Sequence, residues 1–413
     1  MARRFFLETL GCPKNQVDSD KLTGTLLADG YQPADRPGDA ELVIVNTCAF
    51  IEEARQESID TILALADERR DGARLVVTGC LAERYGAELA TAMPEVDAVA
   101  GFGVPVTLGR QPAGVTTPAM DLLNLPRPPA TAPWAYVKVA EGCDRACGFC
   151  AIPSFRGPQR SRPIPAILDE VRALGAREIV LVAQDLAAFG RDKGRGERAI
   201  APLVAAVAET VDRVRLLYLY PSDLTDALVD AICATGVPYF DLSLQHVSAP
   251  LLRRMRSWGD GGRFLGRIAD IREREPAAAF RSNFIVGYPG ETEDDHDALL
   301  AFLDEAQLDW CGFFAYSREE ATYAAELDGA VPRTLVDERL AELRQRQDEI
   351  TAARRDELVG GQVEVLVDLP GVGRSHREAP EIDGVIAVPE SLHVATFATL
   401  TVTAATGPDL DAS

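Results

Sequence analysis

The sequence predicts an α/β protein in three parts: an N-terminal open parallel sheet flanked by helices, a central partial β/α barrel, and a small C-terminal β-barrel. Two observations along the chain support the first two parts. Strand-like apolar runs alternate with helical stretches through the first hundred residues, and six further strand-like runs follow with helices between most of them. Beyond residue 360 the pattern changes to short alternating runs without a helical signature.

The chain is long enough for two or three domains, because it has 413 residues and 47% of them are hydrophobic. We place the domains at residues 1–112, 133–355 and 356–413, with a linker at 113–132. The linker prediction rests on the segment 110–133, which is rich in proline and lacks amphipathic periodicity.

The N-terminal domain is expected to alternate strand and helix. Strands are predicted at 4–9, 41–47 and 74–78, and helices at 18–29, 52–69 and 81–92. This alternation is typical of a parallel sheet covered by helices.

The central domain has the same alternation over a longer stretch. Its strands are predicted at 134–139, 178–183, 215–220, 239–244, 280–286 and 310–316. Helices are predicted at 164–174 and 223–234, and a long charged helix follows at 333–357. In barrels of this kind, catalytic groups stand at the C-terminal ends of the strands.

The composition restricts the partners and the compartment. A formal net charge of −22 argues against DNA and against broad affinity for nucleic acid. The N-terminus is expected to form a strand rather than a signal peptide, and no apolar run is long enough to span a membrane. Eight cysteines without an export signal indicate metal or redox use in a reducing compartment, so we expect a cytoplasmic protein.

The C-terminal domain is acidic. Residues 360–413 contain two arginines, no lysine and eight carboxylates, a formal charge of 2 − 8 = −6. Small β-barrels often bind nucleic acid or protein surfaces, and one that binds RNA should be basic. We therefore expect this barrel to contact something other than RNA.

Three cysteines follow one another closely on a single loop. Cys143, Cys147 and Cys150 have the spacing C-x3-C-x2-C, and neither a fourth cysteine nor a histidine lies nearby. A structural zinc site normally has four protein ligands. A cubane iron–sulfur cluster held by three thiolates keeps one iron open for a small molecule. The loop therefore predicts a 4Fe–4S cluster with a chemical role.

Three other cysteines each follow a predicted strand of the N-terminal sheet. Cys12, Cys48 and Cys80 should converge, because the carboxyl ends of parallel strands share one edge. Any one of them could equally be a buried structural cysteine. Their equivalent positions favour a second cluster. Cys233 and Cys311 are more consistent with core packing.

Polar and glycine-rich residues follow several strands of the predicted barrel. We expect the pocket for a cofactor to be lined by Gln184, Ser243, Gln245, Gly287 and Pro289. Each signal is weak by itself, because strand ends often carry turn residues. His246, in the same region, is interpreted as a surface or hydrogen-bonding histidine.

Four strings of residues resemble one known family. They are Glu8-Thr-Leu-Gly-Cys12-Pro-Lys-Asn15, Asn46-Thr-Cys48-Ala-Phe-Ile, Ile152-Pro-Ser-Phe-Arg-Gly157 and Gly373-Arg-Ser-His-Arg-Glu-Ala-Pro-Glu-Ile-Asp-Gly384. Together with the cysteine loop they resemble the radical S-adenosylmethionine methylthiotransferases over nearly the whole chain. The protein-modifying RimO branch is closer than the tRNA-modifying MiaB branch. Gln184-Asp185-Leu-Ala-Ala departs from that branch's usual Gln-Asp-Thr-Ser-Ala, so hydroxyl contacts there are not expected.

The resemblance implies a TRAM domain at the C-terminus and β-methylthiolation of an aspartate in small-subunit ribosomal protein twelve, at the decoding centre. It implies two 4Fe–4S clusters, one on Cys143, Cys147 and Cys150 that binds S-adenosylmethionine, and one on Cys12, Cys48 and Cys80 that carries sulfur. An electron donor and a sulfur donor are also required, and the sequence identifies neither. The alternatives are a tRNA methylthiotransferase and, more remotely, a non-catalytic ribosome-assembly factor that binds zinc through both sets of cysteines.

Overall fold

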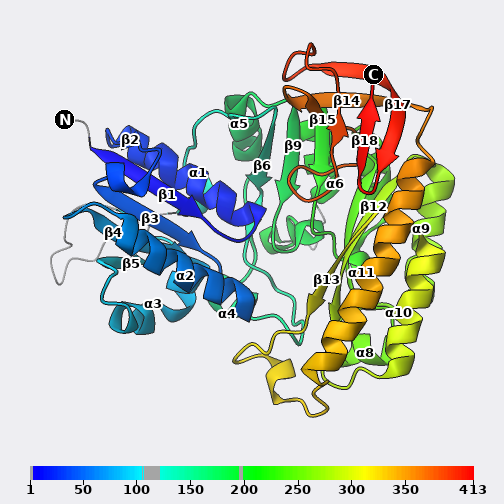
Figure 1. Cartoon of the computed structure of the whole chain (residues 1–413), viewed down its shortest axis with the longest axis horizontal. Coiled ribbons are helices and arrows are strands. Elements are labelled where there is room, and N and C mark those ends of the chain that lie inside the picture. The colour runs from blue at the N-terminus through cyan, green and yellow to red at the C-terminus, as the bar shows by residue number, and fades with distance from the viewer. Residues whose placement is uncertain (1–2, 105, 107–120, 195–198) are drawn as a thin grey trace. The chain divides into compact units, whose positions relative to one another are not determined.

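The computed structural model describes residues 3–104, 106, 121–194 and 199–413, which form two compact units (Figure 1). The first unit comprises residues 1–129, 140–144 and 150–174. The second comprises residues 130–139, 145–149 and 175–413. Part of the predicted linker, residues 113–120, lies outside the described residues.

The first unit is built on a five-stranded parallel sheet with the order β2-β1-β3-β4-β5. Its strands are β1 (Arg4–Thr9), β2 (Gln32–Pro33), β3 (Leu42–Thr47), β4 (Arg74–Gly79) and β5 (Ala98–Ala100). Helices α1 (Pro13–Ala28), α2 (Glu52–Glu68) and α3 (Cys80–Ala92) connect them. Every residue of β3 is buried, as its continuous apolar run predicts for a central parallel strand.

Helix α1 begins earlier than the predicted residue 18, with Pro13 in its first turn. Proline is favoured there because its missing N–H is not needed for a helical hydrogen bond. The apolar pattern concealed this start, since several residues that α1 buries are polar. These are Lys14, Asn15, Asp18, Ser19 and Lys21. Lys21 is satisfied by the carbonyl of Leu123 at 2.6 Å and by Glu170 at 3.1 Å.

Four short elements complete the first unit. They are β7 (Ala140–Glu141), α4 (Ile152–Arg156), β8 (Arg160–Ser161) and α5 (Ile164–Leu174). Strands β7 and β8 pair antiparallel, and the loop 142–151 between β7 and α4 carries the C-x3-C-x2-C cysteines.

The second unit contains six parallel strands in the order β6-β9-β10 and β11-β12-β13, joined between β10 and β11 by a bridge from Leu219 to Leu242. They are β6 (Trp134–Lys138), β9 (Glu178–Val182), β10 (Arg213–Leu216), β11 (Tyr239–Gln245), β12 (Ala279–Val286) and β13 (Trp310–Ala315). The helices are α6 (Ile200–Ala208), α7 (Asp226–Cys233), α8 (Ala249–Arg254), α9 (Gly261–Arg274), α10 (Glu293–Ala306) and α11 (Arg333–Asp356). The predicted partial β/α barrel is confirmed.

Strand β10 lies earlier in the chain than the predicted 215–220. Its buried Arg213 and Arg215 interrupt the apolar pattern at the start of the strand. The chain leaves the strand after Leu216, and Tyr218 has a φ of 65°, with its N–H donated to Asp241 at 2.9 Å.

The last part of the second unit is a closed barrel with the order β14-β15-β16-β18-β17. It is formed by β14 (Gln362–Leu369), β15 (Val372–Arg374), β16 (Ile386–Ala387), β17 (Phe397–Thr406) and β18 (Asp409–Ala412). Val365, Ile386, Val402 and Leu410 fill its interior. This confirms the predicted small β-barrel.

The C-terminal barrel is attached to the starts of the central strands by buried ion pairs. Glu178, at the start of β9, binds Arg215 at 2.8 Å and Arg374 at 3.1 Å. Burial alone would raise the pKa of Glu178, but Arg374 and Arg215 outweigh it and lower the pKa to about 2. Arg215 also donates to the carbonyls of His376 at 2.9 Å and Ser375 at 3.2 Å.

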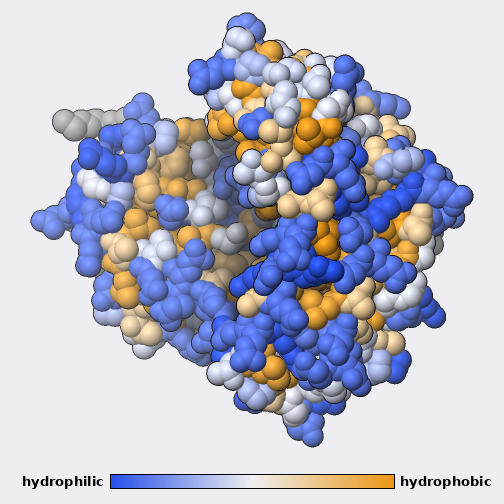
Figure 2. All heavy atoms as spheres, turned by 45° about the vertical axis from the view of Figure 1, so that its right-hand side comes forward, coloured by the Kyte–Doolittle hydropathy of each residue, from blue (hydrophilic) through white to orange (hydrophobic). Residues whose placement is uncertain are grey.

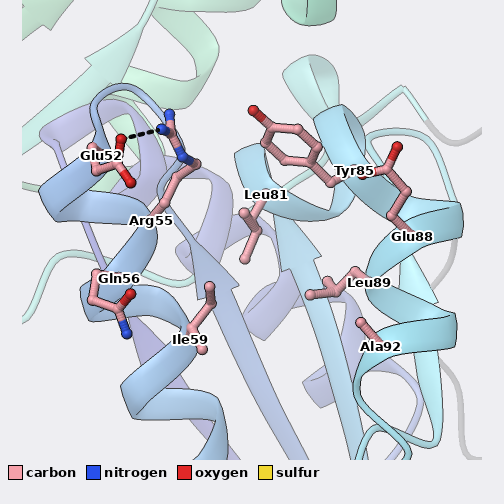
Figure 3. A pocket seen from close by; sticks show the side chains of 9 residues that line it. All are labelled: Glu52, Arg55, Gln56, Ile59, Leu81, Tyr85, Glu88, Leu89 and Ala92. Carbon is pink, nitrogen blue, oxygen red and sulfur yellow. Dashed lines mark hydrogen bonds and ion pairs between the residues drawn. The ribbon is translucent and has the colours of Figure 1, made fainter. Parts of the chain in front are cut away.

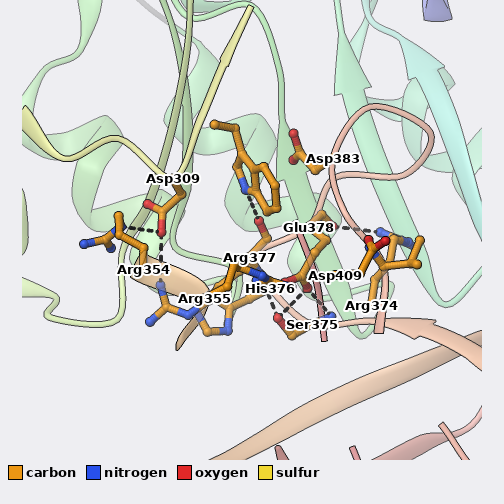
Figure 4. A network of polar contacts seen from close by, with 12 residues as sticks. Asp309, Arg354, Arg355, Arg374, Ser375, His376, Arg377, Glu378, Asp383 and Asp409 are labelled. Carbon is orange, nitrogen blue, oxygen red and sulfur yellow. Dashed lines mark hydrogen bonds and ion pairs between the residues drawn. The ribbon is translucent and has the colours of Figure 1, made fainter. Parts of the chain in front are cut away.

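The loop 374–383 makes further contacts of this kind, and Figure 4 shows part of the network. Trp310 donates its indole N–H to the carbonyl of Arg377 at 2.7 Å, and Tyr239 donates its hydroxyl to Asp383 at 2.6 Å. Burial raises the pKa of Asp383 to about 6 although Arg281 opposes the shift. Residues 373–384, which carried part of the resemblance, therefore mostly make contacts inside the protein.

Hydrophilic residues cover most of the face shown in Figure 2, and hydrophobic residues lie in small groups between them. Within the described ranges, no helix combines the length and the apolar character needed to cross a membrane.

We expect Glu178→Ala to destabilise the second unit by about 3–5 kcal/mol, because it leaves the buried guanidinium of Arg215 without its carboxylate and removes one of the two carboxylates that bind Arg374. The measurement is the free energy of unfolding from urea denaturation. Arg177→Ala is the matched control at the preceding position, where the pair with Asp212 at 2.7 Å is largely exposed and contributes at most about 1 kcal/mol. Equal losses from both substitutions would contradict the importance of the buried network.

Candidate functional site

Three cysteines of the first unit lie at one edge of its sheet. Cys48 and Cys80 directly follow β3 and β4, and Cys12 follows β1 after Leu10 and Gly11; the three strands are parallel neighbours. Gly11, with a φ of 98°, allows the first two loops to approach each other, because a Cβ there would lie 2.9 Å from the Cys48 Sγ. The structure thus brings together the cysteines that the sequence placed at equivalent strand ends.

The thiols influence one another electrostatically. Burial raises the pKa of Cys48 to about 12, and the charges of Cys80 and Cys12 add to this rise. Burial also raises the pKa of Cys80, against the opposing charge of Arg156. At Cys12 burial acts in the same direction, but Lys14, Arg156 and two backbone N–H groups at the start of α1 outweigh it, so the pKa is lowered.

Asn15 fastens the loops that carry these thiols. Its side-chain N–H group donates to the carbonyl of Leu10 at 2.8 Å and to that of Thr47 at 3.0 Å. Its carbonyl oxygen accepts a bond from Arg156 at 2.9 Å and faces the Cys80 Sγ at 3.7 Å. A buried asparagine thus links the ends of β1 and β3 to the start of α3.

Arg156, at the end of α4, places a positive charge at this edge. It donates to the Cys80 Sγ at 3.0 Å and to Glu141 at 2.8 Å, and Asp18 lies 3.6 Å away. Its guanidinium also lies over the ring of Phe102, 4.4 Å from the centroid. Sequence reasoning assigned no role to Asn15 or Arg156, although both occur in the strings that carried the resemblance.

No set of three His, Cys, Asp or Glu side chains in the described part of the chain is arranged around a single metal ion. A cubane cluster does not require such an arrangement, because each thiolate binds a different iron. Three thiols at one edge, with a guanidinium and helix N–H groups beside them, suit an anionic cluster better than a single cation.

The loop with the other three cysteines is fixed at its start. In the first unit, the N–H of Cys143 donates to the carbonyl of Gly157 at 3.1 Å. Gly142 has a φ of 80°, and a Cβ there would lie 2.2 Å from the carbonyl oxygen of Pro158. These contacts hold the chain immediately before Cys143.

The middle of the loop, residues 145–149, belongs to the second unit and contains Cys147. Arg145 binds Asp185 at 2.6 Å and also binds Asp223, and it lies 3.8 Å from the centroid of the Tyr220 ring. Gly148 donates its N–H to the carbonyl of Met255 at 2.7 Å. Both carboxylates follow C-terminal ends of barrel strands, so this segment lies at the rim where catalytic groups are expected.

The five residues predicted for the cofactor pocket lie at or after C-terminal strand ends. Gln184 follows β9, and Ser243 and Gln245 lie on the partly exposed face of β11. Gly287 and Pro289 follow β12, the neighbour of β11. Contacts within the protein account for both: Gly287 donates its N–H to Glu291 at 2.5 Å, and Pro289 accepts a bond from Arg254 at 2.8 Å. Their place in a cofactor pocket stays a prediction.

His246 is buried rather than exposed. Its Nδ1 accepts the N–H of Ser248 at 3.1 Å, and burial lowers its pKa to about 4. It is therefore a neutral, hydrogen-bonding histidine, and the surface alternative was wrong. Cys233 ends α7 and Cys311 lies in β13, where burial raises the pKa of its thiol.

Two cavities are lined by residues other than the six cysteines. One, of about 250 Å³, lies between α2 and α3, where Ile59, Leu81 and Leu89 form an apolar floor (Figure 3). The other, of about 400 Å³, lies in the second unit between β13, α11 and the C-terminal barrel, and its lining includes Arg281 and Asp383.

Comparison with known proteins gives three family matches along the chain. Residues 4–101 match the uncharacterized protein family UPF0004, residues 137–303 the radical SAM superfamily, and residues 359–413 the TRAM domain. Among solved structures, the radical S-adenosylmethionine methyltransferase TsrM from Kitasatospora setae has a TM-score of 0.52 at 15% identity, covering 87% of this chain and 91% of that one. This likeness concerns the fold alone.

Relatives of known name match nearly the whole chain. The ribosomal protein uS12 methylthiotransferase RimO of Moorella thermoacetica is 44% identical over 92% of this chain and 91% of its own length. The protein of the same name from Kineococcus radiotolerans is 40% identical over 99% of this chain and 96% of its own length. The chain therefore belongs to the RimO family of radical S-adenosylmethionine methylthiotransferases.

Proposed function

We propose that this protein adds a methylthio group to the β-carbon of an aspartate in ribosomal protein uS12. The observation that carries this proposal is the near full-length similarity to relatives named for that activity, at 40–44% identity. The six cysteines at the two positions described above supply the ligands that such chemistry requires. A protein that modifies ribosomes works where they are, so we propose a cytoplasmic location.

Cys143, Cys147 and Cys150 are proposed to hold a 4Fe–4S cluster, called here the radical cluster. With S-adenosylmethionine bound, such a cluster supplies a 5′-deoxyadenosyl radical that can take hydrogen from an unactivated carbon. The protein's own contribution is to position the loop. Arg145 and Gly148 fasten the segment around Cys147 to the rim of the barrel, and Gly157 fastens Cys143.

Cys12, Cys48 and Cys80 are proposed to hold a second 4Fe–4S cluster, called here the N-terminal cluster. Its support is the arrangement of three thiols on neighbouring strand ends without a fourth cysteine or histidine in the motif. A site that leaves one iron without a protein ligand can bind sulfur for transfer to a carbon radical.

The pocket for S-adenosylmethionine is proposed to include Gln184, Ser243, Gln245, Gly287 and Pro289. These residues lie at the strand ends of β9, β11 and β12, the rim at which barrels of this kind bind ligands. Ser243 and Gln245 are the better supported, because they share the partly exposed face of one strand.

The exterior of the C-terminal barrel supports a basic protein substrate. Its two arginines, Arg374 and Arg377, are mostly buried in the contact with the central barrel. The carboxylates that remain exposed are Glu364, Glu381, Glu390, Asp409 and Asp411. Ribosomal proteins are mostly basic, so this surface attracts them and repels the phosphates of tRNA. The tRNA alternative is correspondingly disfavoured.

Deleting the gene should remove the mass of one methylthio group from uS12 and from no other protein of the small subunit. The measurement is the intact mass of every small-subunit ribosomal protein from cells with and without the gene, followed by fragmentation to locate the aspartate. A deletion that leaves all these masses unchanged and alters a tRNA nucleoside would establish the tRNA alternative instead.

Replacing Cys147 by Ala should abolish formation of 5′-deoxyadenosine from S-adenosylmethionine, because the radical cluster loses a ligand. The product is measured by chromatography after reduction with dithionite. Cys233→Ala is the control, since this half-buried thiol at the end of α7 is not assigned to a cluster. Cleavage of S-adenosylmethionine that persists in Cys147→Ala would refute the assignment of the loop.

Gly11→Ala should remove the N-terminal cluster, because the added Cβ meets the Cys48 Sγ at 2.9 Å. Iron per chain should then fall by about half, since one of two cubane clusters is lost. Gly30→Ala is the matched control: its φ is 82°, similar to the 98° of Gly11, but a Cβ there meets nothing within 4 Å. An equal fall in both variants would show that backbone strain alone determines the outcome, and full iron in Gly11→Ala would contradict the prediction.

A further inference from the structure

Arg156 connects the two groups of cysteines within the first unit. Its guanidinium donates to the Cys80 Sγ at 3.0 Å, while the carbonyl of the next residue, Gly157, accepts the N–H of Cys143 at 3.1 Å. Cys80 precedes Arg156 by 76 residues, so the fold and not the local sequence creates this contact. Two consecutive residues thus contact one cysteine of each group: Arg156 contacts the thiol of Cys80, and Gly157 contacts the backbone N–H of Cys143.

The guanidinium is held in one orientation. Glu141 binds its Nη1 at 2.8 Å, Asp18 lies 3.6 Å from the same nitrogen, and the Phe102 ring lies against its face. The other nitrogen, Nη2, faces the Cys80 Sγ and the Asn15 oxygen. Because its carboxylate partners are on the Nη1 side, the Nη2 group is directed to the thiol.

The buried position makes this hydrogen bond effective. The Arg156 side chain is 3% exposed, so water does not screen its charge. Hydrogen bonds to the sulfur ligands of an iron–sulfur cluster favour its more electron-rich state and thereby raise its reduction potential. Arginine remains charged under all ordinary conditions and therefore supplies this effect constantly.

We propose that Arg156 is a positioning residue of the N-terminal cluster, which holds the Cys80 thiolate in place and raises the reduction potential of that cluster. The inference rests on the proposed function, because it requires that Cys12, Cys48 and Cys80 hold a cluster. It adds to that function a residue that determines how readily the cluster accepts an electron.

The test uses full-length protein in which Cys143, Cys147 and Cys150 are all replaced by Ala, so that the N-terminal cluster alone remains. In this background we compare Arg156 with Arg156→Gln and Arg156→Lys. The midpoint potential is measured by stepwise reduction with dithionite, which supplies the electron, and is followed by electron paramagnetic resonance and visible absorbance. Iron and acid-labile sulfide per chain are measured on the same samples.

Arg84→Gln is the matched control. Arg84 belongs to the same unit and donates to the carbonyl of Ala49 at 3.1 Å, next to Cys48, so this hydrogen bond goes to a backbone oxygen and not to a thiol. Its substitution removes an equal charge from the same edge of the sheet. It therefore separates a general effect of charge from the effect of the bond to Cys80.

We expect Arg156→Gln to shift the midpoint to more negative potential, Arg156→Lys to shift it less, and Arg84→Gln to leave it unchanged. A purely structural ion pair would lower the stability of the protein and leave the midpoint where it is. Unchanged midpoints with full iron in both Arg156 variants would therefore overturn the inference. If Arg156→Gln does not fold, the same criterion applied to Arg156→Lys decides.

The same experiment separates the inference from the function on which it rests. If the background protein with Arg156 intact holds neither iron nor sulfide, the N-terminal cluster itself is refuted. If it holds the cluster and only the shift is missing, the function stands and the role of Arg156 is refuted.

Discussion

The carboxyl ends of parallel strands share one edge of a sheet, and the functional geometry of this protein depends on that constraint. In the first unit it places three cysteines, separated by up to 68 residues in the chain, on the ends of β1, β3 and β4. In the second unit the same constraint places the Arg145 segment and the proposed cofactor residues along one rim. The cysteines of the first unit therefore need not be close in sequence.

Buried charges have different tasks in the two units. In the second unit, Glu178, Arg215 and Arg374 join the C-terminal barrel to the starts of the central strands, and the pKa of Glu178 is lowered to about 2 in favour of its charged form. This end of the strands is the one where barrels place stability rather than chemistry. In the first unit, a buried guanidinium faces a thiol at the opposite, carboxyl ends of the strands.

Residues 373–384 helped to indicate the family, but their sequence did not show what each side chain contacts. They form one of the four strings that carried the resemblance, yet many of their polar groups are satisfied within the protein, by Arg215, Tyr239 and Trp310 among others. The exterior of residues 360–413 is nevertheless acidic, because both arginines are mostly withdrawn from it while five carboxylates stay exposed.

The sequence by itself determined the order of strands and helices, the fold class and the six candidate ligands, because these follow from local apolar periodicity and from cysteine spacing. The predictions were wrong where polar residues are buried. Asn15 and its neighbours concealed the start of α1, and Arg213 and Arg215 concealed the start of β10. The tertiary structure alone decided that Arg156 contacts Cys80 and that Asn15 links three loops. Such contacts join polar side chains far apart in the chain, and no periodic pattern records them.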